Sequence, residues 1–169
     1  SGNGTAGEYK DSTTTNNGQG GGGTSTAVPS LSSSGQLNGA QSFDGGDYIA
    51  LGTPNIASNN DYTWSTWVNM TALPGTYAGI LGSGSSDKDQ VLWVANNYAG
   101  YNGFGMVSYN PSSVNVANQA ATVSTSQWYF VTGVRNTSSN TIKLYVNGSQ
   151  VASTALTSST ASYGATQDW

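Results

Sequence analysis

The stretch "NTIKLYVNGSQVASTAL" constrains the fold more than any other part of the sequence. Apolar and polar side chains alternate over residues 141–146, which is the pattern of a strand with one buried face. Asn147-Gly148 follows directly, and this pair readily takes the positive φ values of a type I′ turn. The stretch therefore predicts a β-hairpin, with Val151 opposite Leu144 in the return strand.

Short alternating runs of the same kind fill the chain from residue 31 onward, and turn residues separate them. In "DYTWSTWVNM" one face of the predicted strand carries Tyr62, Trp64, Thr66, Val68 and Met70, and the other face carries Trp67. No stretch has the period of an amphipathic helix. Many short strands with turn signals at intervals of roughly 8–12 residues are typical of antiparallel sandwiches and barrels. The predicted fold class is all-β.

Residues 1–30 differ from the rest because they have no periodicity and consist mainly of Gly, Ser, Thr and Asn, as in "NNGQGGGGTST". A segment with so few apolar side chains cannot offset its ordering entropy by burial. We therefore predict a flexible arm or linker over residues 1–30 and a folded β-domain over residues 31–169. The alternative is an arm that becomes ordered against a partner chain.

The composition excludes several classes of partner. Charged residues make up 7% of the chain, against about 25% in an average protein. The formal net charge is −4, and the four cations are scattered along the chain, at Lys10, Lys88, Arg135 and Lys143. Nucleic acid is therefore not an expected partner. Cysteine and histidine are absent, which excludes the usual ligand sets of zinc, copper, iron and haem. Since no apolar run approaches the roughly 20 residues of a spanning helix, membrane insertion is not expected either.

Three stretches carry a resemblance to a known family: "NGAQSFDGGDYIALG", "DYTWSTWVNM" and "STSQWYFVTGVRNTSSNTIKLYVNGSQVAST". They resemble the laminin-G-like modules of the concanavalin A-like lectin/glucanase superfamily, over residues 38–156. In that family an "FDG" and "DY" start leads to a Trp-Val strand, then to a Trp-x-x-Val strand and a Leu-Tyr-Val-Asn-Gly hairpin. The resemblance implies a jelly-roll sandwich of two curved antiparallel sheets.

Modules of this family usually continue after the hairpin with a further pair of strands, where this sequence has "SYGATQDW". The expected sandwich therefore lacks its usual closing strands. Three explanations stay open: the chain is cut short, the sequence covers part of the module, or a neighbouring subunit supplies the missing strand. Because an unpaired gap would expose main-chain groups, an isolated monomer is the least expected state.

An enzymatic role is not expected, although the superfamily includes glycoside hydrolases. Glycoside hydrolysis takes two carboxyl groups, about 5–5.5 Å apart for retention and further apart for inversion. The single glutamate, Glu8, lies in residues 1–30, and only Asp87 and Asp89 are two positions apart, in a Ser/Gly-rich loop. Without His and Cys, the Ser-His and Cys-His nucleophile systems are excluded as well.

Calcium is the one cofactor that the composition leaves as a candidate, because calcium takes oxygen ligands. The candidate ligands are Asp44 and Asp47, or Asp87 and Asp89 together with the nearby Asn96-Asn97 amides. The resemblance supports a site of this kind, since related modules often hold one calcium at the edge of the sandwich. The alternative for Asp87 and Asp89 is a solvated loop tip.

The stretch "SFDGGDYIALG" has a second interpretation, in which Asp44 and Asp47 are turn residues. Both carboxylates can accept hydrogen bonds from nearby main-chain amides without a metal. In the family pattern this stretch opens the sandwich, so Phe43, Ile49 and Leu51 are expected in the core.

The stretch "ANNYAGYNGFG" has the composition of a sugar-binding loop. Exposed aromatic rings provide stacking platforms, and amide groups can bind sugar hydroxyls. The candidate glycan-binding residues are Asn96, Asn97, Tyr98, Tyr101, Asn102 and Phe104. The alternative is that Tyr98 and Tyr101 pack against the edge of the sandwich or against a neighbouring molecule.

Composition and resemblance together predict a non-catalytic structural or interaction module on the outside of an assembly, with other protein subunits as partners. Modules that look similar are frequent in phage capsid-decoration, fibre and tail proteins, so a virion is the expected assembly. The alternative is a glycan-binding adhesion module of a secreted or cell-surface bacterial protein, with residues 1–30 as an interdomain linker. The expected location is the virion surface or, under the alternative, the extracellular space or cell surface.

Overall fold

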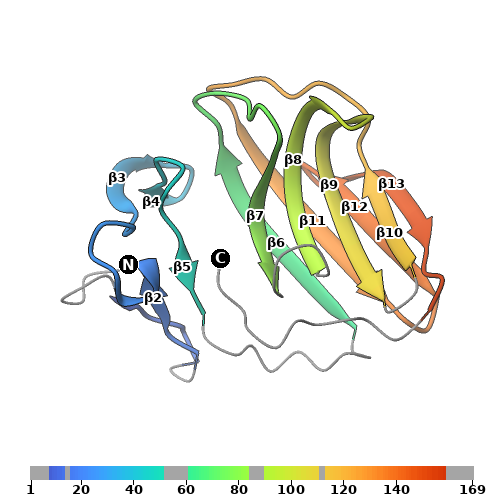
Figure 1. The fold of residues 1–169 in the computed structure, drawn as a ribbon, viewed down its shortest axis with the longest axis horizontal. Coiled ribbons are helices and arrows are strands. Elements are labelled where there is room, and N and C mark those ends of the chain that lie inside the picture. The colour runs from blue at the N-terminus through green and yellow to red at the C-terminus, as the bar shows by residue number, and fades with distance from the viewer. Residues whose placement is uncertain (1–7, 14–15, 52–60, 84–89, 111–112, 159–169) are drawn as a thin grey trace. The chain divides into compact units, whose positions relative to one another are not determined.

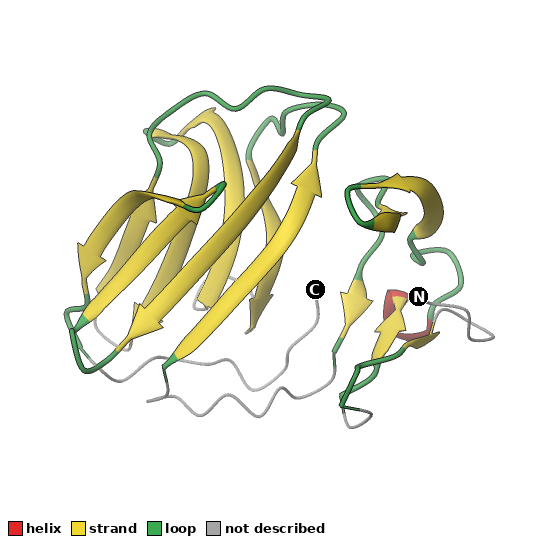
Figure 2. Ribbon diagram, turned by 180° about the vertical axis from the view of Figure 1, so that it is seen from behind, coloured by secondary structure: helices red, strands yellow, loops and turns green. Residues whose placement is uncertain are grey.

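The computed structural model describes residues 8–13, 16–51, 61–83, 90–110 and 113–158 of the chain (Figure 1). The chain divides into two compact units, one formed by Ser1–Asn55 with Ala165–Trp169 and the other by Ile56–Gly164. Strands dominate both units, and the only helix among the described residues is a short 3-10 turn (Figure 2). The predicted all-β fold class is therefore confirmed. No helix in the described part of the chain has the length and hydropathy of a membrane span.

The larger unit is a sandwich of two four-stranded antiparallel sheets. The first sheet has the order β10-β9-β8-β7 and consists of β7 (Tyr77–Ser83), β8 (Gln90–Tyr98), β9 (Tyr101–Asn110) and β10 (Ser113–Asn118). The second sheet has the order β13-β12-β11-β6 and consists of β6 (Tyr62–Asn69), β11 (Trp128–Asn136), β12 (Thr141–Val146) and β13 (Ser149–Ala155). Figures 1 and 2 show them as two layers, so the predicted antiparallel sandwich is confirmed.

The facing sides of the two sheets form one apolar core, because every second residue along each strand points inward. The core residues of the first sheet include Leu92, Val94, Phe104 and Met106, and those of the second include Val131, Ile142, Leu144 and Val146. Gly133 stands among them because a Cβ at this position would lie 2.7 Å from the Met106 sulfur atom. On β6 the side chains of Tyr62, Trp64 and Val68 pack against the core, while Trp67 contacts Phe130 on the opposite face. The predicted facing of this strand is confirmed.

The β12–β13 hairpin turns at Asn147 and Gly148, whose φ values are 52° and 82°. The predicted type I′ turn is therefore confirmed. The predicted partner of Leu144 is wrong by one position, since Ala152 lies opposite Leu144 and Val151 falls in an irregularity of the ladder. An extra residue of this kind shifts the register beyond it, and no alternation pattern reveals it in advance.

Hydrogen bonds connect the two sheets along the side where β10 and β13 meet. Thr154 Oγ1 donates to the Val116 carbonyl at 2.6 Å, and the Thr157 amide donates to Asn115 Oδ1 at 3.1 Å. Asn115 also ends a row of four buried polar residues that pair across the first sheet, namely Ser83, Gln90, Ser108 and Asn115. The Tyr62 hydroxyl of the second sheet donates to Gln90 Oε1 at 2.7 Å. One end of the sandwich interior is therefore polar and hydrogen-bonded.

The smaller unit contains a three-stranded sheet, a hairpin and the 3-10 turn. The sheet has the order β1-β2-β5, with β1 (Glu8–Tyr9), β2 (Gly18–Gly20) and β5 (Ile49–Ala50), the hairpin is β3 (Ser30–Gly35) with β4 (Asn38–Ser42), and the turn is Gly21–Gly23. The amide of Gly21 donates to the Tyr48 carbonyl at 2.8 Å, and the Tyr48 hydroxyl donates back to the Gly21 carbonyl at 3.0 Å. Main-chain and tyrosine hydrogen bonds thus organise a segment that has few apolar side chains.

Residues 1–30 contain regular structure, since β1, β2 and the 3-10 turn lie there. The division of the chain at residue 30 stays a prediction. The role of residues 1–30 as an arm or linker stays a prediction. The expected burial of Phe43 and Leu51 is wrong, because both are exposed. Leu51 lies against Gly18 of β2, which has no side chain to cover it.

Candidate functional site

The stretch predicted as a sugar-binding loop is the hairpin formed by β8 and β9. Tyr98 and Tyr101 face each other as its last pair, and Ala99 and Gly100 form the turn with φ values of 51° and 84°. Both values are positive, as a type I′ turn requires. An irregularity lies between Ala95 and Tyr98 and thus includes Asn96 and Asn97, which are exposed.

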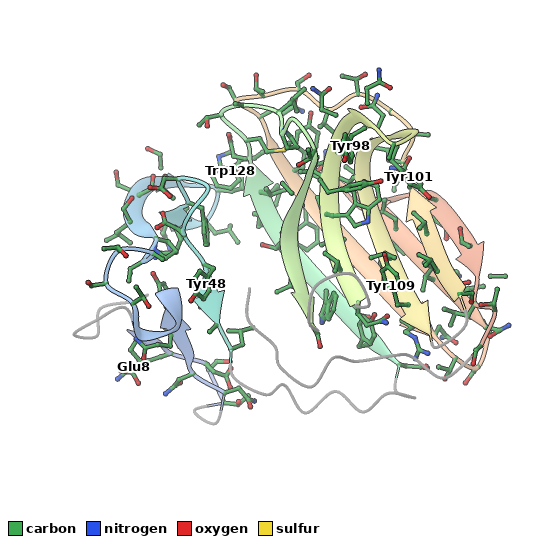
Figure 3. All side chains as sticks on the ribbon, viewed as in Figure 1. Glu8, Tyr48, Tyr98, Tyr101, Tyr109 and Trp128 are labelled. Carbon is green, nitrogen blue, oxygen red and sulfur yellow. The ribbon has the colours of Figure 1, made fainter. Side chains whose placement is uncertain are left out.

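Four aromatic side chains meet on the outer face of the first sheet, which is the face turned away from the core. We call Tyr77, Trp93, Tyr98 and Tyr101 the aromatic cluster. The Tyr77 and Tyr98 rings are 5.0 Å apart at 89°, Tyr77 and Trp93 are 5.2 Å apart at 77°, and Trp93 and Tyr101 are 5.6 Å apart at 75°. Such edge-to-face contacts are the favoured arrangement of aromatic rings. Figure 3 shows Tyr98 and Tyr101 at the hairpin end of β8 and β9, and Tyr109 near the other end of β9.

A glycine on a neighbouring strand makes room for the indole of Trp93. Gly79 on β7 and Gly105 on β9 are its direct partners in the sheet. A Cβ at Gly105 would lie 2.1 Å from Cζ2 of Trp93, so the indole lies directly against the main chain of β9. Glycine within a strand often marks such a close approach.

The residues of the aromatic cluster differ in how much of each side chain is exposed to solvent. Trp93 is 5% exposed, whereas Tyr77 and Tyr98 are 43% and 40% exposed. The pKa of the Tyr77 phenol is raised above 10.0, first by burial of the group and then by the neighbouring phenols of Tyr101, Tyr98 and Tyr109. Tyr77 and Tyr98 therefore provide the accessible aromatic surface, and the raised pKa keeps Tyr77 a neutral hydroxyl-bearing ring at physiological pH.

Hydrogen bonds link amide and hydroxyl groups of the β8–β9 hairpin with those of the chain around the end of β10. Asn102 Oδ1 accepts the Asn97 amide at 3.4 Å, and Asn102 Nδ2 donates to the Thr122 hydroxyl at 3.1 Å. The side chain of Asn118 donates to the Asn102 carbonyl at 2.9 Å. These bonds connect the hairpin with β10 and the segment after it, and they fix the position of the Asn102 side chain.

The structure brings five of the six predicted glycan-binding residues together on one hairpin, but Phe104 is not among them. Phe104 is 0% exposed and packs its ring against Tyr129 in the sandwich core, at 5.2 Å. Its assignment to the binding surface is therefore wrong. The turn consists of Ala99 and Gly100 alone, so Phe104 already lies in β9, where its side chain points inward.

The sequence interpretation missed Tyr77 and Trp93. The signal for Trp93 was the run "VLWVA", in which both alternating sets of residues are apolar. Such a run indicates a strand whose two faces are both covered. No comparable local signal pointed to Tyr77, because it joins the cluster through pairing of β7 with β8.

Comparison with known proteins shows which family the chain belongs to. Residues 43–169 match the laminin-G-like family described as "Concanavalin A-like lectin/glucanases superfamily". The chain belongs to this superfamily. The fold is also similar to domain 4 of AbnA, a GH43 extracellular arabinanase from Geobacillus stearothermophilus, solved in complex with arabinotriose. The TM-score is 0.61 at 14% identity, and the match covers 83% of this chain and 64% of the length of that one. No curated protein sequence matches the chain.

The candidate calcium ligands of this concanavalin A-like chain have main-chain partners where they are described. Asp47 Oδ2 accepts the Asp44 amide at 3.0 Å, and Asp44 Oδ1 accepts the Gly46 amide at 2.9 Å. These are the bonds of a turn, as the second interpretation of the stretch had it. Within the described ranges no three Asp or Glu residues gather as a metal site. Asp87 and Asp89 lie outside the described residues, so calcium binding stays a prediction.

Charge is absent from the strands that carry the aromatic cluster. The four strands of the first sheet contain no Asp, Glu, Lys or Arg. In the described part of the larger unit the charged residues are Asp61, Arg135 and Lys143, of which Lys143 and Arg135 belong to the second sheet and Asp61 directly precedes it. The outer face of this concanavalin A-like sheet therefore offers aromatic rings, hydroxyls and amides.

Proposed function

We propose that this chain is a carbohydrate-binding module whose ligand lies on the aromatic cluster, against Tyr77 and Tyr98. The observation that carries the proposal is the perpendicular pair of half-exposed tyrosine rings at a hairpin that also exposes Asn96 and Asn97. Carbohydrate sites typically combine aromatic rings with a few polar groups that fix the orientation of the ligand. The arabinotriose held by the similar AbnA domain supports a glycan as the ligand.

In this proposal the tyrosines, the asparagines and Trp93 have different roles in binding. The apolar face of a sugar ring stacks on a tyrosine, and its hydroxyls bond with the exposed amides of Asn96 and Asn97. Trp93 lies beneath and holds the Tyr77 and Tyr101 rings through its edge-to-face contacts. A ring that is held in place loses less entropy when a ligand binds.

We propose binding without hydrolysis. Cleavage of a glycosidic bond takes two carboxyl groups, about 5–5.5 Å apart for retention and about 6.5–9.5 Å apart for inversion. The strands beneath the aromatic cluster carry no carboxylate at all. A sugar on this face would therefore be held intact.

A second candidate function is that of a structural subunit on the outside of a larger assembly, such as a phage capsid-decoration, fibre or tail protein. The observation that favours it is that two leucines of the smaller unit, Leu31 and Leu37, are each 73% exposed. Exposed apolar side chains that gather in a patch are typical of protein interfaces. The two functions are compatible, because a module on a virion or a bacterial cell surface can itself touch glycans.

A glycan array tests the first proposal. Wild-type protein, Tyr98→Ala and the control Tyr145→Ala would be applied with and without calcium, Tyr145 being a tyrosine on β12 of the second sheet. We expect selective binding that Tyr98→Ala abolishes and Tyr145→Ala retains. The proposal is contradicted if no glycan on the array binds selectively, or if Tyr98→Ala binds as well as the wild-type protein.

Sedimentation velocity tests the second candidate. Wild-type protein should associate with itself or with its assembly, and the double substitution of Leu31 and Leu37 by Ser should prevent this. A wild-type chain that remains monomeric and enters no particle would contradict the structural role.

A further inference from the structure

We infer that the aromatic cluster is selective for neutral glycans and rejects acidic ones such as uronates and sulfated sugars. This inference rests on the proposed carbohydrate-binding function and names its ligand class. It follows from the distribution of charge over the described residues and over the whole sequence.

The first step concerns the groups that a bound sugar would meet. The ligand surface consists of phenol rings and their hydroxyls, on a hairpin that also exposes the Asn96 and Asn97 amides. None of these groups carries a charge near neutral pH. Sugar hydroxyls can exchange hydrogen bonds with all of them. A carboxylate or sulfate brought against the rings would lose water and gain no cation in return.

The second step concerns where the cations are. The chain has four. Arg135 is 1% exposed and belongs to β11, and Lys143 belongs to β12, so both are in the second sheet. Lys10 belongs to the smaller unit, and Lys88 lies outside the described residues. No Lys or Arg therefore stands on the described strands that carry the aromatic cluster.

The third step concerns the field of the whole chain. A formal net charge of −4 repels a polyanion at long range and slows its encounter with any face of the protein. A neutral polymer does not experience this repulsion. Its affinity should therefore be insensitive to salt, which screens charges beyond about 10 Å at 0.1 M.

The amide groups and Tyr77 also predict how the affinity for a neutral glycan depends on pH. Amides do not titrate, and the pKa of Tyr77 is raised above its ordinary value of 10.0. A neutral ligand should therefore lose no affinity through Tyr77 or the amides from about pH 5 to about pH 9.

The experiment uses one polymer in two forms. A neutral glycan that binds on the array is derivatised with carboxymethyl groups in one sample and with hydroxyethyl groups of similar size in the other. Affinities for wild-type protein and Tyr98→Ala are measured by calorimetry at about 0.02 M and about 0.5 M NaCl. We expect the hydroxyethyl form to bind with less than about a twofold change between the two salt concentrations, and the carboxymethyl form to bind at least about tenfold more weakly.

Each result decides one proposition. Equal or stronger binding of the carboxymethyl form, or of an acidic polymer such as polygalacturonate or heparin, overturns the neutral selectivity while the carbohydrate function stands. A loss of neutral-glycan affinity of about tenfold at high salt overturns it as well. If neither neutral nor acidic glycans bind at all, the proposed function itself fails, and the inference fails with it.

Discussion

The indole of Trp93 occupies the space that a side chain at position 105 would need, since a Cβ on Gly105 would lie 2.1 Å from Trp93 Cζ2. Trp93 in turn contacts the edges or faces of Tyr77 and Tyr101, at centroid distances of 5.2 and 5.6 Å. The positions of the Tyr77 and Tyr101 rings therefore depend on Gly105, a glycine of β9. Gly105 acts on the proposed binding surface through the Trp93 ring.

Gly105→Ala should destabilise the larger unit and weaken glycan binding together. The added methyl group forces the indole away from β9, and over-packing of this kind costs about 1–3 kcal/mol of unfolding free energy. Urea denaturation measures the stability, and tryptophan fluorescence reports greater exposure of an indole that is now 5% exposed. The matched control is Gly75→Ala, because a Cβ at Gly75 meets no atom within 4 Å. Equal stability of the two variants would show that the indole has room to move.

The turn and facing rules that apply within one strand or hairpin succeeded on this sequence. Asn147-Gly148 predicted its turn, and alternation predicted which face of β6 carries Trp67, because both depend on neighbouring residues only. The aromatic cluster depends on more. Tyr77 meets Tyr98 through the pairing of β7 with β8, and irregularities after Gly79 and after Ala95 set that register. A period-two pattern carries no information about where such an extra residue falls.

The error at Phe104 has the same physical origin. The glycines and asparagines of "ANNYAGYNGFG" suggested one long loop, but only Ala99 and Gly100 form the turn. Gly103 and Gly105 are strand residues on either side of Phe104. The indole of Trp93 on β8 occupies the space that a side chain at Gly105 would need. The reason for that glycine lies in Trp93, twelve positions earlier, which the local composition does not disclose.

Tyr62→Phe should destabilise the polar end of the sandwich. The Tyr62 hydroxyl donates to Gln90 Oε1 at 2.7 Å, and Gln90 is 0% exposed. Loss of a donor to a buried acceptor costs about 1–3 kcal/mol of unfolding free energy. Chemical denaturation of both variants measures it against Tyr145→Phe, whose hydroxyl bonds Gln150 at 3.3 Å on the outside. We expect the control to stay within about 0.5 kcal/mol of wild type, and a comparable loss in the two variants would contradict the role of the buried bond.

Gly148→Ala should strain the β12–β13 turn. The φ value of 82° at Gly148 lies in the region that costs a residue with a Cβ about 1–2 kcal/mol. Because β12 supplies Ile142 and Leu144 to the core, the strain should appear as a lower free energy of global unfolding. The neighbouring Ser149→Ala is the control and should leave the denaturation midpoint unchanged. A wild-type midpoint for Gly148→Ala would mean that the turn relaxes without cost.

Asp61 should make the stability of the larger unit depend on acid pH. Its Oδ1 atom accepts both the hydroxyl and the amide of Thr137, each at 2.6 Å, across the turn between β11 and β12. The hydroxyl bond first and the amide bond second hold the pKa of Asp61 below the ordinary value of 3.8. A carboxyl whose pKa is lower in the folded chain stabilises the fold fully above its unfolded pKa, and this stabilisation is lost as the pH falls through the folded pKa.

Asp61→Asn should therefore be less stable than wild type at neutral pH, and the difference should vanish as the pH falls below 3.8 through the folded pKa of Asp61. Urea midpoints of the two proteins, measured from about pH 7 to about pH 2, give the comparison directly. Thr137→Val tests the partner, because it removes the hydroxyl donor and should reduce the acid dependence while the amide bond remains. A stability difference between wild type and Asp61→Asn that stays constant over this range would show that the carboxylate charge contributes nothing at the turn.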